Sequence, residues 1–216
     1  GELRNLTELS LGENRLSGEL PKELGQLENL VRVYLNNNMF SGRLPAEITR
    51  MRSLNFLNLQ NNCLAGNLPD EIGDWESLVE LYLANNEITG TLPASIGKMK
   101  RLKILDVFGN RMSGVLPPEL CELVQLNYLN LRNNRFSGSL PVEIGKMTEL
   151  SSLDLTSNKF SGPLPKEIGQ LTRLTSLLLS ENEFSGELPE TLGNLVNLRN
   201  FYVKTNRLSG PFPVVL

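Results

Sequence analysis

Glu80 and Asp106 form the carboxylate pair whose types and spacing in this sequence could support acid–base chemistry. If the segments that carry them are neighbouring strands, the two carboxyl groups would lie about 6–9 Å apart, within the range that glycoside hydrolases use. Catalysis also needs a pocket, a lid and supporting residues, and the surrounding sequence has no pattern typical of them. We therefore interpret the pair as part of a surface and not as an active site.

The remaining residue types offer little for an enzyme. The chain contains no histidine, which removes Ser-His-Asp and Cys-His nucleophiles and most zinc sites. The Gly-Lys pairs at 97–98 and 145–146 lack the glycine spacing of a phosphate-binding loop. The sequence thus predicts a protein that is not an enzyme and has no cofactor and no metal site.

Cys63 and Cys121 are the two cysteines of the chain. They fall at different positions of the repeat described below, about two strand spacings of roughly 4.8 Å apart and displaced around the coil. A disulfide needs Cα atoms within about 7 Å. We expect two free thiols.

These residues must be positioned by a repeat, because the whole chain is one 24-residue unit written nine times without insertion or deletion. A fixed period of this length indicates a solenoid, in which each unit buries its apolar face against its neighbours. The repeats cover the chain as a single domain, and the sequence shows no terminal caps. Their boundaries are 1–24, 25–48, 49–72, 73–96, 97–120, 121–144, 145–168, 169–192 and 193–216.

The repeat that spans 145–168 shows what each position does. Residues 150–155 end in alternating apolar and polar side chains, which predicts a strand with one buried face. Asn158 belongs to a column that is Asn in all nine rows, and an amide in every row can satisfy the backbone of the buried turns as a ladder. Gly162 permits a backbone conformation or close approach that a side chain would block. Pro165 suits an edge or the first position of a short helical turn, and Glu167 favours that turn's positive end.

The pattern LxxLxLxxNxFSGxLPxxIGxL, present in phase throughout the chain, resembles the plant-type class of leucine-rich repeats. The resemblance implies an α/β solenoid: a right-handed superhelix with a parallel sheet on its concave face, a second short strand on the flank, and helical or 3₁₀ turns on the convex side. One departure is that Leu or Phe212 precedes the proline where plant receptors mostly carry Ile. Similar Leu-Pro repeats occur in other eukaryotes and in bacteria.

Functional residues are expected where the repeat leaves the residue type free. On each strand, the eighth, tenth, twelfth and thirteenth positions of the row face away from the core and line the concave sheet. All four tyrosines of the chain lie in these columns, as do two phenylalanines. One exposed aromatic residue is expected on each of five consecutive strands: Tyr34, Phe56, Tyr82, Phe108 and Tyr128.

Exposed aromatic rings beside amides and arginine are typical of binding surfaces, although cross-strand contacts that only stabilise a sheet would produce the same pattern. Arg132 stands beside Phe108 and diagonal to Asp106, where it could form a cation–π contact or an ion pair. The same charges could instead form a self-satisfied surface network. We predict a partner-binding surface made of Arg32, Tyr34, Phe56, Asn58, Glu80, Tyr82, Asp106, Phe108, Tyr128 and Arg132.

Other surface features are less informative. Asn5-Leu6-Thr7 is an N-x-S/T sequon, so Asn5 is a glycosylation candidate if the protein is secreted. One edge of the repeat is basic, and either a docking edge or a solvated flank explains it; its members are Arg15, Arg111, Arg135, Lys159 and Arg207. Apolar residues at the two open ends predict end-to-end association or frayed terminal rows; they are Leu6, Leu9, Leu11, Phe201, Val203, Leu208 and Phe212.

A net charge of -3 without basic runs argues against nucleic acid as the partner, and no apolar run is long enough to suggest membrane contact. The leading hypothesis is a non-catalytic module that binds a protein or peptide ligand across the concave face. The resemblance to receptor ectodomains implies an extracellular or cell-surface location, as a fragment of a larger protein, with a cytoplasmic one still open. The alternatives are a structural or engineered repeat scaffold without a natural ligand, and an inhibitor similar to those that act on pectin-degrading enzymes.

Overall fold

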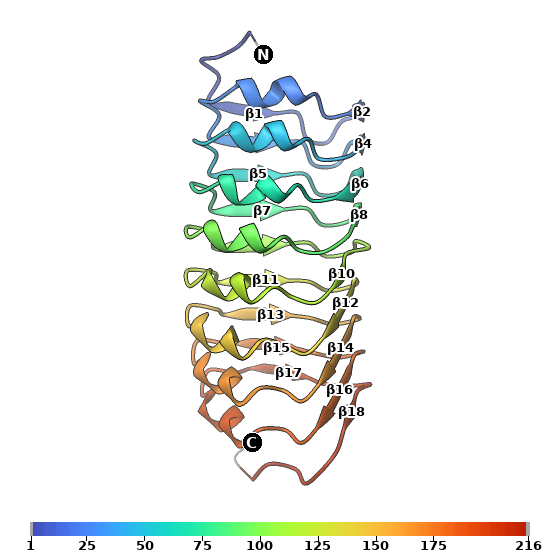
Figure 1. The fold of residues 1–216 in the computed structure, drawn as a ribbon, viewed down its shortest axis with the longest axis vertical. Coiled ribbons are helices and arrows are strands. Elements are labelled where there is room, and N and C mark those ends of the chain that lie inside the picture. Colours follow the sequence, from blue (N-terminus) through green and yellow to red (C-terminus); the bar gives the residue numbers. More distant parts are fainter. Residues whose placement is uncertain (1, 215–216) are drawn as a thin grey trace.

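The protein is a stack of coils, each of which corresponds to one 24-residue repeat (Figure 1). The structure is a computed structural model that describes residues 2–214. A coil begins with a strand of the main sheet, continues with a short strand on the flank, and returns through a 3₁₀-helical turn on the opposite side of the core. The main sheet forms the concave wall that the repeat pattern predicts.

The main sheet has nine parallel strands in chain order. Its register joins each residue to the one 24 positions later, as in the pairing of Glu8 with Arg32 and of Leu9 with Val33. Equivalent positions of successive repeats therefore form straight columns across the sheet. The strands are β1 (Glu8–Ser10), β3 (Arg32–Tyr34), β5 (Phe56–Asn58), β7 (Glu80–Tyr82), β9 (Ile104–Asp106), β11 (Tyr128–Asn130), β13 (Ser152–Asp154), β15 (Ser176–Leu178) and β17 (Asn200–Tyr202).

The flank carries two further parallel sheets with a different register. Here Ser113 is paired with Arg135 and Ser137 with Lys159, so each strand is offset from the next by two residues relative to the repeat. The four-stranded sheet contains β2 (Ser17–Glu19), β4 (Met39–Gly42), β6 (Cys63–Asn67) and β8 (Glu87–Thr89). The five-stranded sheet contains β10 (Ser113–Gly114), β12 (Arg135–Gly138), β14 (Lys159–Gly162), β16 (Glu183–Gly186) and β18 (Arg207–Leu208).

Every helical segment in residues 2–214 is a 3₁₀ helix of five residues. The proline that occurs in every row precedes each helix as its N-cap in an extended conformation, for example Pro69 with φ -68° and ψ 146°. Of the two places expected for this proline, an edge or the first helical position, it does not take the second: it is the last extended residue, one position before the helix. The helices are η1 (Lys22–Gln26), η2 (Ala46–Arg50), η3 (Asp70–Asp74), η4 (Ala94–Lys98), η5 (Pro118–Glu122), η6 (Val142–Lys146), η7 (Lys166–Gln170) and η8 (Glu190–Asn194).

The asparagine column forms the predicted ladder. Asn86 donates through Nδ2 to Leu59 O of the preceding coil at 3.0 Å and to Leu83 O of its own coil at 3.0 Å. Its Oδ1 accepts the backbone N–H of Leu64 at 2.9 Å. Each such side chain joins two coils and satisfies buried backbone groups that the sharp turn leaves unpaired.

Aliphatic columns fill the space between the sheets and the 3₁₀ turns. Three successive rows place phenylalanine on the flank side of this core, where Phe136 and Phe160 stack with 6.2 Å between ring centroids and Phe160 and Phe184 with 6.0 Å. Trp75 is fully buried, and its indole Nε1 donates to Ile48 O at 3.1 Å. Burial with a satisfied polar atom is the usual arrangement for tryptophan in a core.

The thirteenth position of the row adopts a left-handed backbone conformation, as at Asn37 with φ 54° and Gly109 with φ 67°. Asn and Gly reach this region most easily, which explains their frequency in this column. The two cysteines are free thiols as predicted, with Cys63 exposed and Cys121 buried. At the last coil Phe201 is partly buried and Phe212 is 77% exposed; pairing of the end faces with another molecule stays a prediction.

Candidate functional site

The ten predicted binding residues all come from the main sheet or from the turns directly after its strands. Eight lie in β3, β5, β7, β9 and β11, while Phe108 and Arg132 lie two residues past the ends of β9 and β11. None of the ten is buried. Their neighbours within each strand, such as Leu57 and Leu81, are buried, so the predicted residues occupy the outward face of the sheet.

Three aromatic rings form a continuous strip across neighbouring strands. Tyr34 and Phe56 have ring centroids 4.6 Å apart, and Phe56 and Tyr82 have centroids 5.6 Å apart. The strand register explains this contact, because Phe56 is directly opposite Arg32 and Glu80 and therefore diagonal to the two tyrosines. We call Tyr34, Phe56 and Tyr82 the aromatic strip.

Of the other two aromatic residues, Tyr128 lies on a strand as expected, whereas Phe108 does not. Phe108 lies in the turn after β9, and the guanidinium of Arg132 sits 5.8 Å from its ring centroid. Of the two interactions expected for Arg132, the structure therefore has the cation–π contact. Tyr128 lies on β11 and accepts a hydrogen bond at Oη from Nδ2 of Asn130 at 3.2 Å.

Asn58 and Asp106 have a structural role that sequence reasoning missed. Oδ1 of Asn58 accepts the N–H of Gln60 at 3.1 Å, and Oδ1 of Asp106 accepts the N–H of Phe108 at 3.0 Å. This local bond from the side chain to the residue two positions later is an Asx turn, which closes the strand end. Asn130 and Asp154 make the same bond further along the column. The recurrence of Asn and Asp at this position was the signal available in the sequence.

The charged groups of the face differ in how they are paired. Arg32 forms an ion pair with Glu8 at 2.7 Å, so its charge is matched within the protein. Glu80 accepts a hydrogen bond from the Tyr82 hydroxyl at 2.8 Å. Within residues 2–214 neither Glu80 nor Asp106 takes part in an ion pair. The centre of the face therefore carries carboxylates without a matching cation.

Burial changes the acid–base behaviour of this centre. Desolvation raises the pKa of Asp106, and the hydrogen bond from the Phe108 N–H opposes that rise. Desolvation also raises the pKa of Tyr82 and of Tyr128, with neighbouring carboxylates adding to the effect. Both phenols stay protonated at neutral pH: the Tyr82 hydroxyl donates its proton to Glu80, and the Tyr128 hydroxyl, which accepts from Asn130, keeps its proton for a ligand.

Two observations describe what chemistry the concave face can support. Among the residues described, no three His, Cys, Asp or Glu side chains come together as a metal-binding group. Glu80 and Asp106 are occupied by the Tyr82 hydroxyl and the Phe108 N–H. The arrangement presents rings, amides, phenols and carboxylates on an open sheet and thus suits recognition of another molecule.

No helix within residues 2–214 combines the length and the apolar character of a membrane span.

Three leucine-rich-repeat models match the sequence in consecutive stretches. A model described as a leucine-rich repeat region matches residues 113–209, and a leucine rich repeat model matches residues 76–136. A third, also described as a leucine rich repeat, matches residues 5–27, 29–51 and 53–75. A comparison with curated protein sequences finds no match.

Solved structures with the same fold include two plant receptors. The plant peptide hormone receptor RGFR1 in complex with RGF2 is 33% identical, with a TM-score of 0.94 over 98% of this chain and 34% of its own. The Arabidopsis receptor kinase HAESA in complex with the peptide hormone IDA and the co-receptor SERK1 is 36% identical, with a TM-score of 0.95 over 98% and 35%.

A bacterial structure is also similar. A leucine-rich-repeat protein of Leptospira interrogans is 38% identical, with a TM-score of 0.80 over 99% of this chain and 52% of its own. The chain thus spans about a third of the length of the two plant receptors and about half of the bacterial protein. The fold and the repeat class are shared across these proteins.

Proposed function

Because the chain belongs to the leucine-rich-repeat family, we propose that it is a non-catalytic recognition module that binds a peptide or protein ligand on the concave sheet. RGFR1 is a peptide hormone receptor in complex with RGF2, and HAESA is in complex with the peptide hormone IDA, which supports a peptide as the partner. A location outside the cell, as part of a longer receptor-like protein, belongs to the same proposal.

The observation that carries the proposal is the aromatic strip beside carboxylates without a cation. Tyr34, Phe56 and Tyr82 are half-buried on the outward face of the sheet with their rings in contact, while Glu80 and Asp106 lie on the neighbouring positions. Aromatic residues supply much of the binding energy in interfaces, and the half-buried carboxylates favour a partner that brings hydrogen-bond donors or positive charge. An extended peptide can follow the columns of the sheet, since they run straight from coil to coil.

Peptides selected from a random library on the wild-type protein provide the test. A triple variant with Tyr34→Ala, Tyr82→Ala and Tyr128→Ala should bind the selected peptides at least about a hundredfold more weakly, since loss of a central interface aromatic costs about 2 kcal/mol or more. Its melting temperature should fall by only a few degrees, because the variant loses the ring contacts of Phe56 with Tyr34 and Tyr82 but keeps the buried core.

Tyr202→Ala is the matched control, because Tyr202 is an exposed tyrosine on β17 of the same sheet and lies outside the proposed site. It should bind the selected peptides as the wild type does. Selected peptides that bind the triple variant and the wild type equally would overturn the proposal, and a library that yields no binder would favour a structural scaffold.

A further inference from the structure

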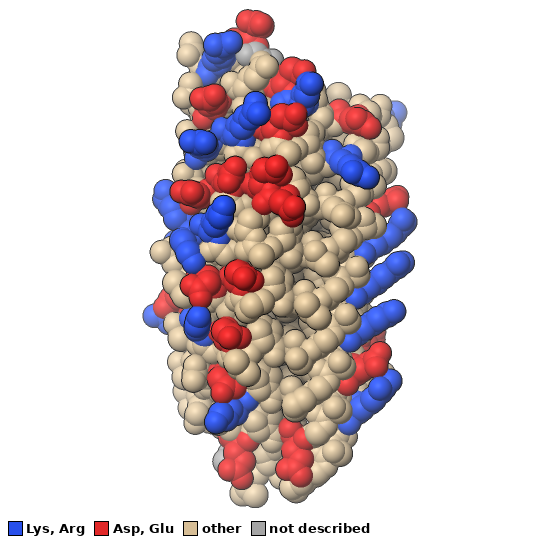
Figure 2. All heavy atoms as spheres, viewed as in Figure 1, with Lys and Arg blue, Asp and Glu red and all other residues tan. Residues whose placement is uncertain are grey.

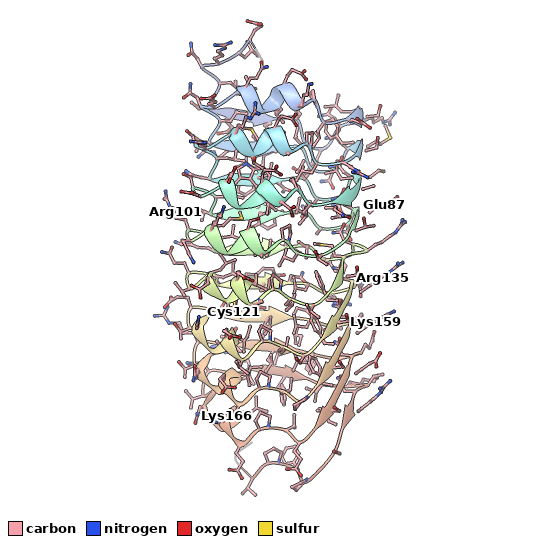
Figure 3. The ribbon with its side chains drawn as sticks, in the orientation of Figure 1. Glu87, Arg101, Cys121, Arg135, Lys159 and Lys166 are labelled. Carbon is pink, nitrogen blue, oxygen red and sulfur yellow. The ribbon has the colours of Figure 1, made fainter. Side chains whose placement is uncertain are left out.

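The flank of the solenoid has a row of cations that the concave site does not use. In Figure 2 blue side chains project side by side along one edge of the stack, and Figure 3 identifies Arg135 and Lys159 among them, on the side of Glu87. They occupy one column of the repeat, which in consecutive rows reads Glu87, Arg111, Arg135, Lys159, Glu183 and Arg207. All three central cations are exposed.

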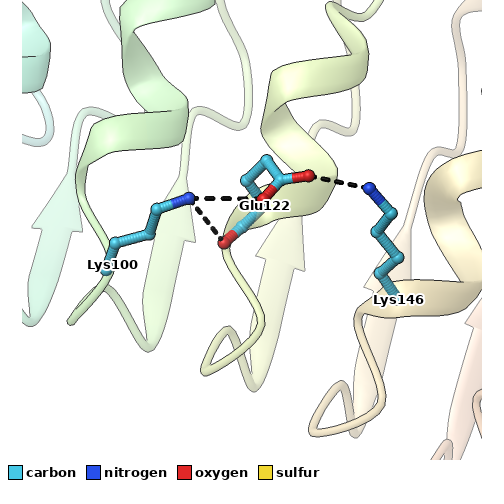
Figure 4. A network of polar contacts seen from close by, with 3 residues as sticks. All are labelled: Lys100, Glu122 and Lys146. Carbon is cyan, nitrogen blue, oxygen red and sulfur yellow. Dashed lines mark hydrogen bonds and ion pairs between the residues drawn. The ribbon is translucent and has the colours of Figure 1, made fainter.

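Pairing within this column leaves its centre positively charged. Arg111 forms an ion pair with Glu87 at 3.2 Å, and Arg207 forms one with Glu183 at 3.0 Å. In the part of the chain that the structure describes, Arg135 and Lys159 form no ion pair. On the convex side, by contrast, two cations share one carboxylate, since Lys100 and Lys146 both contact Glu122, at 3.5 and 2.8 Å (Figure 4).

Each of the two cations is paired with a serine on the neighbouring strand. The register of the flank sheet pairs Arg135 with Ser113 and Lys159 with Ser137. Since the residues that follow Arg135 and Lys159, Phe136 and Phe160, are buried, alternation along the strand places the cations and the serines on the outward face. A carboxylate can accept bonds from an N–H and an O–H donor together.

The offset of the flank sheet decides which acidic partner fits. Arg135 is two residues before Ser137, the partner of Lys159, so the Cα atoms of the two cations are separated by one strand spacing and two residue rises, about 8 Å. Alternate side chains of an extended peptide repeat every 6.6–6.8 Å or so. Side chains on one face of a helix are only about 5–6 Å apart. The spacing of an extended peptide is closer to that of the cations than the spacing on a helix is, and long, flexible cationic side chains can bridge the remaining difference.

We propose that Arg135 and Lys159 of the flank column dock an extended acidic segment of a partner protein whose carboxylates occupy alternate positions. Arg135 with Ser113 and Lys159 with Ser137 form two equivalent carboxylate sites, and Glu87 and Glu183 limit the segment at both ends. The contact is exposed, so it is weak, fast and sensitive to salt. It lies on a different sheet from the aromatic strip and goes beyond the proposed ligand site.

The charge-reversal variant Arg135→Glu with Lys159→Glu provides the first arm of the test. It should fold normally, because Glu87 and Glu183 already occupy the same column. Its matched control is Arg101→Glu with Lys166→Glu, which changes the net charge equally on exposed residues away from this edge (Figure 3). Glu149 and Glu190 show that those two columns also accept glutamate.

The probes are a fluorescent peptide with glutamate at every second position and a second peptide of the same composition with its glutamates in one block. Fluorescence anisotropy at low salt should show the alternating peptide binding the wild type and the control alike, and the reversal variant at least about tenfold more weakly. The triple tyrosine variant should bind it as the wild type does, which separates this proposal from the concave site.

Three outcomes would overturn the inference: equal binding of the alternating peptide to the reversal variant, equal affinity for the two peptides, or stronger binding of an acidic oligosaccharide than of the alternating peptide. The first would place the contact elsewhere on the protein. The second would mean that binding depends on charge alone and not on the spacing of the glutamates. The third would mean that the partner is a carbohydrate and not a protein segment.

Discussion

The ring of Tyr34 packs against the ring of Phe56 with 4.6 Å between their centroids and an interplanar angle of 34°. The two residues are on neighbouring strands, and a diagonal cross-strand contact brings the rings together. Such a contact stabilises the sheet and at the same time forms a preorganised surface for a ligand. The stabilising part can be measured without a ligand.

A double-mutant cycle on Tyr34→Ala and Phe56→Ala should give a coupling energy of about 0.5–1.5 kcal/mol from urea unfolding, the range for aromatic pairs. Tyr34→Ala with Tyr128→Ala is the control, because these residues are separated by several strands and should be additive within about 0.5 kcal/mol. Equal coupling in both cycles would show that the ring contact adds nothing.

Replacing a ladder asparagine should lower the free energy of unfolding strongly in a central coil and only slightly in the first coil. Asn86→Ala leaves the N–H of Leu64 without its acceptor and removes one of the two side-chain donors from each of the carbonyls of Leu59 and Leu83, so we expect a loss of about 1–3 kcal/mol in the free energy of unfolding. The side chain of Asn14 is exposed and makes hydrogen bonds only within its own coil, so Asn14→Ala should cost less than about 1 kcal/mol. Similar losses for both variants would contradict the ladder's role between coils.

Gly73 is held by close approach of the next coil. A Cβ at this position would lie 2.2 Å from the backbone oxygen of Ser95, a contact that only movement of the backbone can relieve. Gly73→Ala should therefore lower the free energy of unfolding by about 1–3 kcal/mol. Cys121 occupies the same column with its side chain buried, so Cys121→Ala removes only a small group and should cost about 1 kcal/mol. Denaturant unfolding of both variants compares the two effects, and an unaffected Gly73→Ala would show that the coils separate easily.

Asp106→Asn should stabilise the protein at neutral pH and have little effect in acid. Burial raises the pKa of Asp106 above its unfolded value, so the folded state binds the proton more tightly and stability falls as pH rises through the interval between the two pKa values. Asn58 and Asn130 show that an amide makes the same bond to the residue two positions later. Thermal unfolding at several pH values should show the variant's advantage appearing as the wild-type carboxyl ionises. An advantage that is constant with pH would rule out ionisation as its cause.

The two thiols should differ in reactivity. Cys63 is exposed, whereas Cys121 is fully buried and desolvation raises its pKa to about 12. A thiol reagent at pH 8 should modify one cysteine rapidly in the native protein and the second only on unfolding, and Cys63→Ser should abolish the fast phase. Fast modification of Cys121 in the folded variant would mean that η5 opens readily.

The sequence alone was sufficient to predict the solenoid, its nine parallel strands, the asparagine ladder and the free thiols. The first three follow from columns that recur in every row, since a repeated local pattern permits few ways to bury its apolar side chains, and the free thiols follow from the separation of the two cysteines in the stack. The outward position of Tyr34, Phe56 and Tyr82 was predictable for the same reason, because alternation along a strand fixes the face.

The tertiary structure decided which side chains of neighbouring rows contact each other. The contact of Arg132 with Phe108 in place of Asp106, the pairing of Arg32 with Glu8, and the use of Asp106 in closing its own turn depend on side-chain rotamers and on competing partners from adjacent coils. The two-residue offset of the flank sheet is a further example, because the sequence period is the same on every side of the coil while the strand register is not. The residue type at each repeat position can be read from the sequence alone, whereas strand register and side-chain pairing depend on how whole coils pack against one another.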